Sequence, residues 1–199
     1  EYLLMKWVLG QEAAPMSDGR SGIEILGKIT DYLRSQQRPD GGWGQYPGSA
    51  ADLSGTVKAY FALKLAGDDL AAPHMIRAAN CVHSMGGAEH CNSFSNFYLA
   101  ALGQIPWSAV PTIPPEVIWL PKWCFFHLSK VSAWSRTMIL PLAIVSVLRP
   151  TREIPASQGI DELFLDQRER ARLYRRSDGS VIWRAIFGVI DRTLKVAER

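Results

Sequence analysis

The sequence predicts an all-α fold built from helical hairpins. Two observations support this prediction. Apolar residues recur at helical spacing in several separate segments, and Gly-Gly pairs at 41–42 and 86–87 each join two helical segments. No segment gives a convincing strand pattern, and we expect about six helices. With 199 residues, 47% hydrophobic and 21% charged, the chain is long enough for one domain with a real core.

Charge and cysteine content exclude several classes of protein. The net charge is +3, and no basic run is interleaved with aromatic residues, which argues against a nucleic-acid partner. The three cysteines, Cys81, Cys91 and Cys124, form no Cys-x-x-Cys pair and indicate reduced thiols in a cytosolic compartment. The chain begins at Glu1 without a signal-like leader, and we expect it to be a partial chain.

The first half of the chain predicts five helices. Residues 1–10 read as the end of a helix that stops at Gly10, and residues 22–36 place an apolar stripe on one face. The third helix is capped by Asp52 or Ser54, ends at Gly67 and has apolar positions on several sides, so it should be buried on more than one side. The fourth helix spans about 73–85, and the fifth spans 94–103.

The second half begins with a proline-rich segment. Five prolines between 106 and 121 exclude a regular helix there and predict an extended crossing. Residues 132–148 form the most apolar predicted helix, with Pro141 inside it, but its apolar run is shorter than the roughly 18–20 residues that span a bilayer. We expect a short turn or helix at 159–166, and a last amphipathic helix at 181–196.

The turn from Gln37 to Trp43 organises the first hairpin. Pro39, Asp40 and two glycines supply turn chemistry, and an amide and an indole bracket the turn. One interpretation is a clamp in which the Gln37 side chain bonds backbone at a helix end while Trp43 packs over it. The alternative is an ordinary helix–turn–helix with a stray tryptophan.

Three stretches carry a resemblance to a known family. The pattern from Ile25 through Gln37-x-x-x-Gly41-x-Trp43 resembles the QW repeat of triterpene cyclases, particularly squalene–hopene cyclases. Residues 52–64 resemble the helix that follows this repeat, and residues 114–137 are very similar to bacterial squalene–hopene cyclases. The resemblance implies an α/α-barrel, here residues 1–199 as an incomplete toroid of helical hairpins from the inserted barrel, with the second, acid-bearing barrel absent.

The resemblance also implies a reaction. Such enzymes cyclise squalene, or a related linear triterpene, to pentacyclic hopanoids by protonation and a carbocation cascade, as isomerases or lyases without a cofactor. Their proton donor lies in an Asp-x-Asp-Asp motif that this sequence lacks. Asp68-Asp69 is the only adjacent pair, has Ala66 where the first Asp should be, and is expected in a solvated loop. No catalytic residue is therefore expected, and the chain alone should be inactive.

Three residues correspond to positions of the family's substrate cavity. Trp134 and Phe94 match aromatic residues that line it, where an aromatic face attracts a passing carbocation by roughly 1–2 kcal/mol. Without the resemblance, both would be assigned to the core. Glu1 matches a glutamate of a polar network at the far end, but Asn92 and Lys58 replace its arginine and glutamate partners, so that network is altered or absent. Ser95-Asn96 also departs from the family's usual Thr-Arg.

The sequence gives only weak indications of a metal site or of a nucleophilic active site. Cys81-x-His83 and His90-Cys91 lack a recognised zinc spacing, so no metal is expected, and His74 and His127 lack a paired acid and nucleophile.

The family is monotopic, which implies a peripheral position on the cytoplasmic face of a bacterial membrane, with a homodimer allowed for the full-length protein. Residues 183–194 have interfacial character, or form an ordinary core helix. The alternative function is a non-catalytic α/α-repeat protein that binds an apolar ligand or a barrel-completing partner chain.

Overall fold

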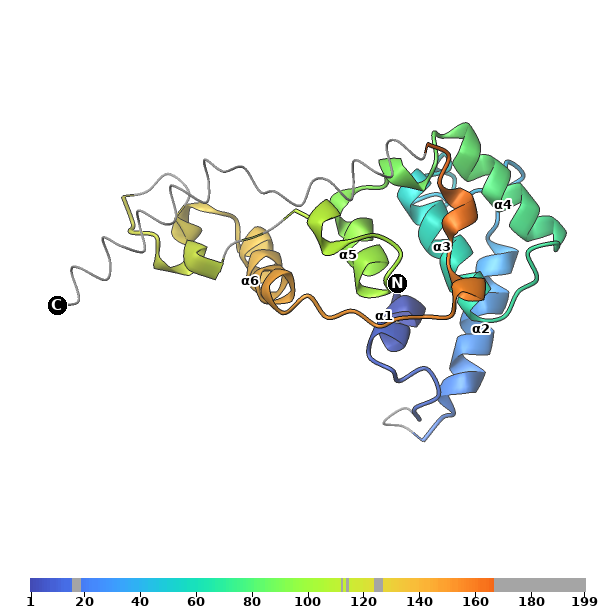
Figure 1. The fold of residues 1–199 in the computed structure, drawn as a ribbon, viewed down its shortest axis with the longest axis horizontal. Helices are drawn as coiled ribbons and strands as arrows, with labels where there is room; N and C mark the ends of the chain where they lie inside the picture. Colours follow the sequence, from blue (N-terminus) through green and yellow to red (C-terminus); the bar gives the residue numbers. More distant parts are fainter. Residues whose placement is uncertain (16–18, 112, 114, 124–126, 167–199) are drawn as a thin grey trace.

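The computed structural model describes residues 1–15, 19–111, 113, 115–123 and 127–166. This part of the chain is all-α, as predicted, and its only β-type pairing is an isolated bridge between Gly44 and Ala51. The α-helices are α1 (Tyr2–Val8), α2 (Gly22–Ser35), α3 (Leu53–Leu65), α4 (Pro73–Ser84), α5 (Ser93–Ala101) and α6 (Ala133–Leu148). Figure 1 shows α1 to α5 gathered around α3, with α6 set to one side.

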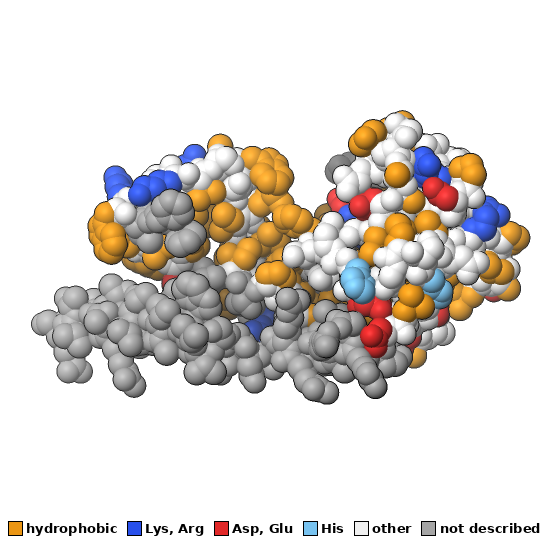
Figure 2. Space-filling view, turned by 90° about the horizontal axis from the view of Figure 1, so that it is seen from above, with side chains coloured by type: hydrophobic (Ala, Val, Ile, Leu, Met, Phe, Trp, Pro, Cys, Tyr) orange, Lys and Arg blue, Asp and Glu red, His pale blue; other side chains and the backbone are white. Residues whose placement is uncertain are grey.

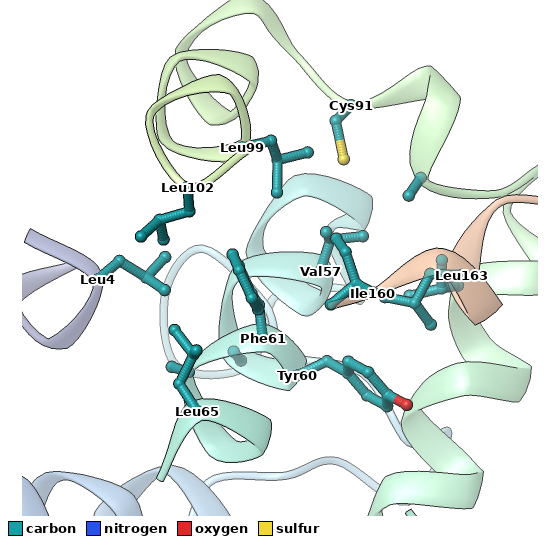
Figure 3. Close-up of a cluster of buried hydrophobic side chains, with 14 of the residues drawn as sticks. Leu4, Val57, Tyr60, Phe61, Leu65, Cys91, Leu99, Leu102, Ile160 and Leu163 are labelled. Carbon is teal, nitrogen blue, oxygen red and sulfur yellow. The ribbon is translucent and has the colours of Figure 1, made fainter. Parts of the chain in front are cut away.

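Helix α3 is the centre of the core. Ten of its thirteen residues are buried, so the prediction of burial on more than one side is confirmed. Figure 3 shows Val57 and Phe61 of α3 meeting Leu4 of α1, Leu99 of α5 and Ile160 from the end of the described chain. The helix begins where the Asp52 carboxylate accepts a hydrogen bond from the backbone N–H of Gly55, at 2.7 Å. Ser54, the other predicted cap, instead accepts a hydrogen bond from the backbone N–H of Asn92.

The turn after α2 is a clamp, as predicted, and both of its bracketing side chains bond backbone. The Trp43 indole N–H donates to the carbonyl of Leu33 in the last turn of α2, at 2.8 Å. The Gln37 amide donates to the carbonyls of Gly41, within the turn, and of His74, in the first turn of α4. The predicted bond from Gln37 to backbone at a helix end is therefore confirmed, and the helix end is the start of α4. The alternative of a stray tryptophan is wrong, since Trp43 is buried.

Gly41 allows this turn to pack against α4. Its φ is +87°, and a Cβ atom added there would lie 2.3 Å from the carbonyl oxygen of Arg77. The second turn also uses positive φ, at Gly86 and Gly87, which agrees with the predicted repetition of helix, Gly-Gly turn and helix.

The chain after α6 returns across the core lobe, which we define as α1 to α5 together with this returning strap, residues 150–166. Figure 1 shows the strap running past α1 and up beside α3. Its Ile160 and Leu163 are fully buried. Lys64, buried on α3, donates to the carbonyl of Gly159 and pairs with Glu162 at 2.7 Å, and the Tyr60 hydroxyl donates to the same carboxylate at 2.7 Å. The strap is therefore part of the core.

A second clasp ties the strap to the loop after α1. Arg152 forms two hydrogen bonds with the Glu12 carboxylate, at 2.8 and 2.9 Å, and also donates to the carbonyl of Trp7. Its guanidinium lies 5.1 Å from the centre of the Trp7 ring. The hydrogen bonds from Arg152 lower the pKa of Glu12 to about 2.

The proline-rich segment differs from the prediction of an extended crossing. It contains two short 3₁₀ helices, η2 (Trp107–Ala109) and η3 (Pro115–Trp119), and a third, η4 (Leu128–Lys130), precedes α6. Proline fits the first residues of such a turn because no N–H is needed there. Helix α6 continues through Pro141 and packs against η3, and we call η3, η4 and α6 the α6 lobe. The predicted helix at 181–196 lies outside the described residues, as does Cys124.

Replacing Gly41 should destabilise the protein far more than replacing Gly48. Both have positive φ, but nothing lies within 4 Å of a Cβ at Gly48, whereas a Cβ at Gly41 would meet the backbone of Arg77. We expect Gly48→Ala to lower the free energy of unfolding by about 1 kcal/mol and Gly41→Ala by about 3 kcal/mol. Urea denaturation measures both, and equal losses would show that the close approach to α4 does not matter.

The Glu12–Arg152 clasp should make stability depend on pH. Because the pKa of Glu12 falls from 4.5 to about 2 on folding, its stabilisation is complete above pH 4.5 and is lost as the pH falls towards 2. Both side chains are partly exposed, so we expect Glu12→Gln to cost only about 1 kcal/mol at pH 7. The difference from the wild type should shrink in urea denaturation between pH 4.5 and 2.5, and a constant difference would contradict the assignment.

Candidate functional site

An open cleft of about 670 Å³ lies between α1, α2, α3 and the loop that follows Trp43. Ile29 and Leu33 of α2 and Ala59 and Ala62 of α3 supply apolar wall. The remaining lining is largely polar and aromatic: Tyr32, Gln36, Arg38, Gln45, Tyr46, Ser49, Asp52, Lys58, Asn92 and Glu1. A cleft with an apolar wall and several polar groups is typical of a ligand-binding site.

The structure brings Glu1 into contact with Lys58, one of the two residues that replace its expected partners. The Lys58 ammonium lies 2.5 Å from the Glu1 carboxylate, and Asn92 lines the same cleft. The Asn92 side chain accepts a hydrogen bond from the backbone N–H of Ser95 and so caps α5. The hydrogen bond that the Glu1 carboxylate accepts from Lys58 lowers the pKa of Glu1. Glu1 is thus held ionised by a cation, which weakens it as an acceptor of a proton.

The two aromatic candidates lie elsewhere. Phe94, at the start of α5, is 48% exposed, and Trp134, at the start of α6, is 69% exposed. Neither lines the cleft beside Glu1. The assignment of these side chains to the core was therefore wrong, because each projects from the first turn of a helix into solvent. Their role in a substrate cavity stays a prediction.

Asp68 was misjudged from the sequence. It was expected in a solvated loop, but its side chain is only 6% exposed and pairs with Arg34 at 2.5 Å and His74 at 2.6 Å. Burial alone would raise the pKa of Asp68, but the hydrogen bonds from Arg34 and His74 outweigh it and lower the pKa. His74 therefore has an acidic partner that the sequence did not reveal, although Asp68 lies only six residues away. A carboxylate held ionised in this way is unsuited to protonate a substrate.

The cysteine and histidine residues do not converge. Cys81 and Cys91 are free and buried, and burial raises the pKa of the Cys91 thiol to about 12. His83 bonds the carbonyl of Glu162, and His90 bonds the carbonyl of Gly86. His127 accepts a hydrogen bond from the backbone N–H of Ser129. Within the described ranges, no three His, Cys, Asp or Glu side chains are placed to hold a metal ion.

No helix in the described segments is both long enough and apolar enough to cross a bilayer. The fold and the site therefore define an all-α domain of helical hairpins, with a ligand-sized cleft on its core lobe and exposed aromatic side chains at two helix starts.

The chain matches the model of one known protein family over its full length. Residues 1–199, the whole chain, match the family model of the squalene-hopene cyclase N-terminal domain, and the chain belongs to this family. The observed helices agree with a fragment of the α/α-barrel of triterpene cyclases.

Curated relatives agree with the family. The chain is 40% identical over 199 residues to a squalene–hopene cyclase of Bradyrhizobium diazoefficiens, covering 100% of this chain and 29% of the relative. It is 38% identical to that of Zymomonas mobilis, covering 100% and 28%. It is 35% identical to that of Alicyclobacillus acidocaldarius, covering 98% and 29%. The chain thus spans less than a third of the length of these relatives.

Removing the Lys58 ammonium should raise the pKa of Glu1. In Lys58→Met the hydrogen bond that lowers this pKa is lost, so it should return towards 4.5. The carboxyl carbon of Glu1, followed by NMR as a function of pH, measures the change. Lys28→Met is the matched control, because Lys28 is a lysine in an ion pair on α2, with Glu24. An unchanged Glu1 titration in Lys58→Met would show that the ion pair does not form in solution.

Proposed function

We propose that this chain is the N-terminal part of a squalene–hopene-type cyclase, which converts squalene or a related linear triterpene to a polycyclic product by protonation and carbocation cyclisation. The observation that carries the proposal is the match of the whole chain to the N-terminal domain of this family, together with relatives that are named squalene–hopene cyclases. Residues 1–199 would form part of the inserted barrel, and the acid-bearing barrel would supply the rest of the enzyme.

In this proposal the chain supplies cavity wall rather than the acid. The sequence lacks Asp-x-Asp-Asp, and its one Asp-Asp pair includes Asp68, which is held ionised by Arg34 and His74. Phe94 and Trp134 present aromatic faces that are free to meet a substrate, and each would stabilise a nearby carbocation by roughly 1–2 kcal/mol once water is excluded. Figure 2 shows hydrophobic side chains on the side of the α6 lobe that faces the core lobe.

Glu1 would be a weakened base in this enzyme, because its ion pair with Lys58 lowers the pKa of its carboxyl group. Its carboxylate is neutralised by Lys58 at 2.5 Å, so loss of the final proton from the cyclised cation would fall to another group or to water. The pair could still orient the polar end of the cleft, where Asn92 offers an amide. The motif Gln37, Gly41 and Trp43 would act structurally, by fixing the first hairpin against α4.

The proposed location of the enzyme follows from the low solubility of its substrate in water. Squalene is insoluble in water, so we propose that the parent protein works as a monotopic protein at the cytoplasmic face of a bacterial membrane, in hopanoid synthesis, and that it can form a homodimer. These proposals rest on the family relationship. The sequence-based membrane candidate, residues 183–194, lies outside the described residues.

A chimeric enzyme tests the function. The corresponding N-terminal region of the Bradyrhizobium relative is replaced by this chain, and squalene cyclisation is assayed in detergent. We expect an active chimera. Trp134→Leu should lower its turnover about tenfold, because one aromatic face is lost. This chain alone should give no cyclised product.

The control is Trp119→Leu, another exposed tryptophan of the α6 lobe, which should leave turnover in detergent unchanged. Equal losses in the two variants would refute a cavity role for Trp134. A folded but inactive chimera, combined with binding of squalene by the chain itself, would instead favour a non-catalytic protein that binds an apolar ligand.

A further inference from the structure

Phe94 lies in a helical turn that is anchored on its inner side. It is the second residue of α5, and the side chain of the N-cap residue, Asn92, accepts a hydrogen bond from the backbone N–H of Ser95 at 2.9 Å. The backbone N–H of Asn92 in turn donates to the buried hydroxyl of Ser54 on α3, at 2.9 Å. Figure 3 shows Cys91, the residue before the cap, with its sulfur directed into the apolar core. Ser95 is fully buried, so the start of α5 is held in place while Phe94 projects outward.

Trp134 occupies the same place in α6. It is the second residue of that helix and follows the N-cap residue Ser132. The Ser132 hydroxyl accepts a hydrogen bond from the backbone N–H of Ser135 at 3.1 Å, and the two hydroxyl oxygens lie 2.9 Å apart. The Thr137 hydroxyl donates to the carbonyl of Trp134 at 2.6 Å. Both aromatic candidates for the substrate cavity are therefore the second residue of a helix that a side chain caps.

The caps hold the backbone from which each ring projects. An α-helix leaves its first N–H groups unpaired, and a capping side chain stabilises the first turn by accepting a hydrogen bond from one of them. Capping is not general among the described helices, because α1, α2 and α4 begin without a side-chain cap hydrogen bond. The rings of Phe94 and Trp134 are exposed within the described part of the chain. The capped turn, rather than contacts of the ring itself, therefore sets the direction in which each ring projects.

We propose that Asn92 and Ser132 are positioning residues for the cyclisation, each holding the aromatic ring of the helix that it caps. An aromatic face attracts a cation only within about 6 Å of the ring centre, so a ring on a frayed turn no longer stabilises a carbocation. A carbocation that is not stabilised loses a proton to water and leaves as a partly cyclised alkene. The two caps thus determine how completely the substrate is cyclised. This role rests on the proposed function, because it requires Phe94 and Trp134 to meet the substrate.

Amide hydrogen exchange in the chain itself tests whether the caps hold the two turns. Asn92→Ala should speed exchange of the Ser95 amide about fivefold, because the hydrogen bond that protects this amide is lost. Ser132→Ala should do the same for the Ser135 amide. Asn92→Ser and Ser132→Asn keep a capping side chain, so both should restore slow exchange. NMR on the full chain measures the rates, and unchanged exchange in the alanine variants would overturn the proposal.

The chimeric enzyme tests whether the caps act on the reaction. We expect Asn92→Ala and Ser132→Ala to raise the share of partly cyclised products about fivefold, in proportion to the frayed population, and to lower turnover while KM stays unchanged. Asn92→Ser and Ser132→Asn should restore the wild-type product pattern. The control is Glu12→Gln, which should cost similar stability by breaking the clasp with Arg152 and should leave turnover and products unchanged. All variants are compared at a temperature at which circular dichroism shows them folded.

The outcomes separate the positioning role from the proposed function. Partly cyclised products that rise in the alanine variants and fall again in the rescue variants would establish the positioning role. Faster exchange with an unchanged product pattern in an active chimera would remove that role and keep the proposed function. A folded but inactive chimera would remove both, since the positioning role requires the reaction. An equal change of products in Glu12→Gln would assign the effect to a general loss of stability and overturn the positioning role.

Discussion

Burial of α3 on all sides is the constraint on which the rest of the structure depends. A helix that is apolar around its circumference must be covered by several elements, and here they come from both ends of the described chain. Leu4 of α1, Leu99 of α5 and Ile160 of the strap all meet it. Because α3 cannot be covered by its neighbours in sequence alone, the strap has to return across the core.

Polar clasps fix the direction from which each element covers α3. Arg152 ties the strap to Glu12, Lys64 and Tyr60 tie it to Glu162, and Trp43 and Gln37 tie the first turn to α2 and α4. Each of these hydrogen bonds is worth only about 1 kcal/mol, so the apolar core supplies most of the stability. The clasps instead select one packing arrangement, since a shifted strap would leave buried polar groups such as Lys64 unpaired.

The core lobe and the α6 lobe carry different kinds of side chain. On the core lobe, ion pairs restrain the candidate acids and bases: Lys58 holds Glu1, and Arg34 and His74 hold Asp68. The α6 lobe instead exposes aromatic and apolar side chains among basic residues. A reaction that passes a carbocation along a hydrocarbon needs apolar and aromatic walls with few bases, because a base in the wrong place would end the cascade early. The described chain agrees with that requirement.

The sequence by itself determined the helices, their approximate bounds, the turn chemistry and the family. Helical periodicity, proline and glycine act over a few residues, and long matching stretches identify relatives directly. Tertiary structure alone decided which side chains meet across the chain. The contact of Gln37 with α4, the ion pair of Lys58 with Glu1, the burial of Asp68 and the exposure of Trp134 each depend on residues tens of positions away, or on an uncovered face. Local patterns carry no information about such distances, because the packing around α3 sets them.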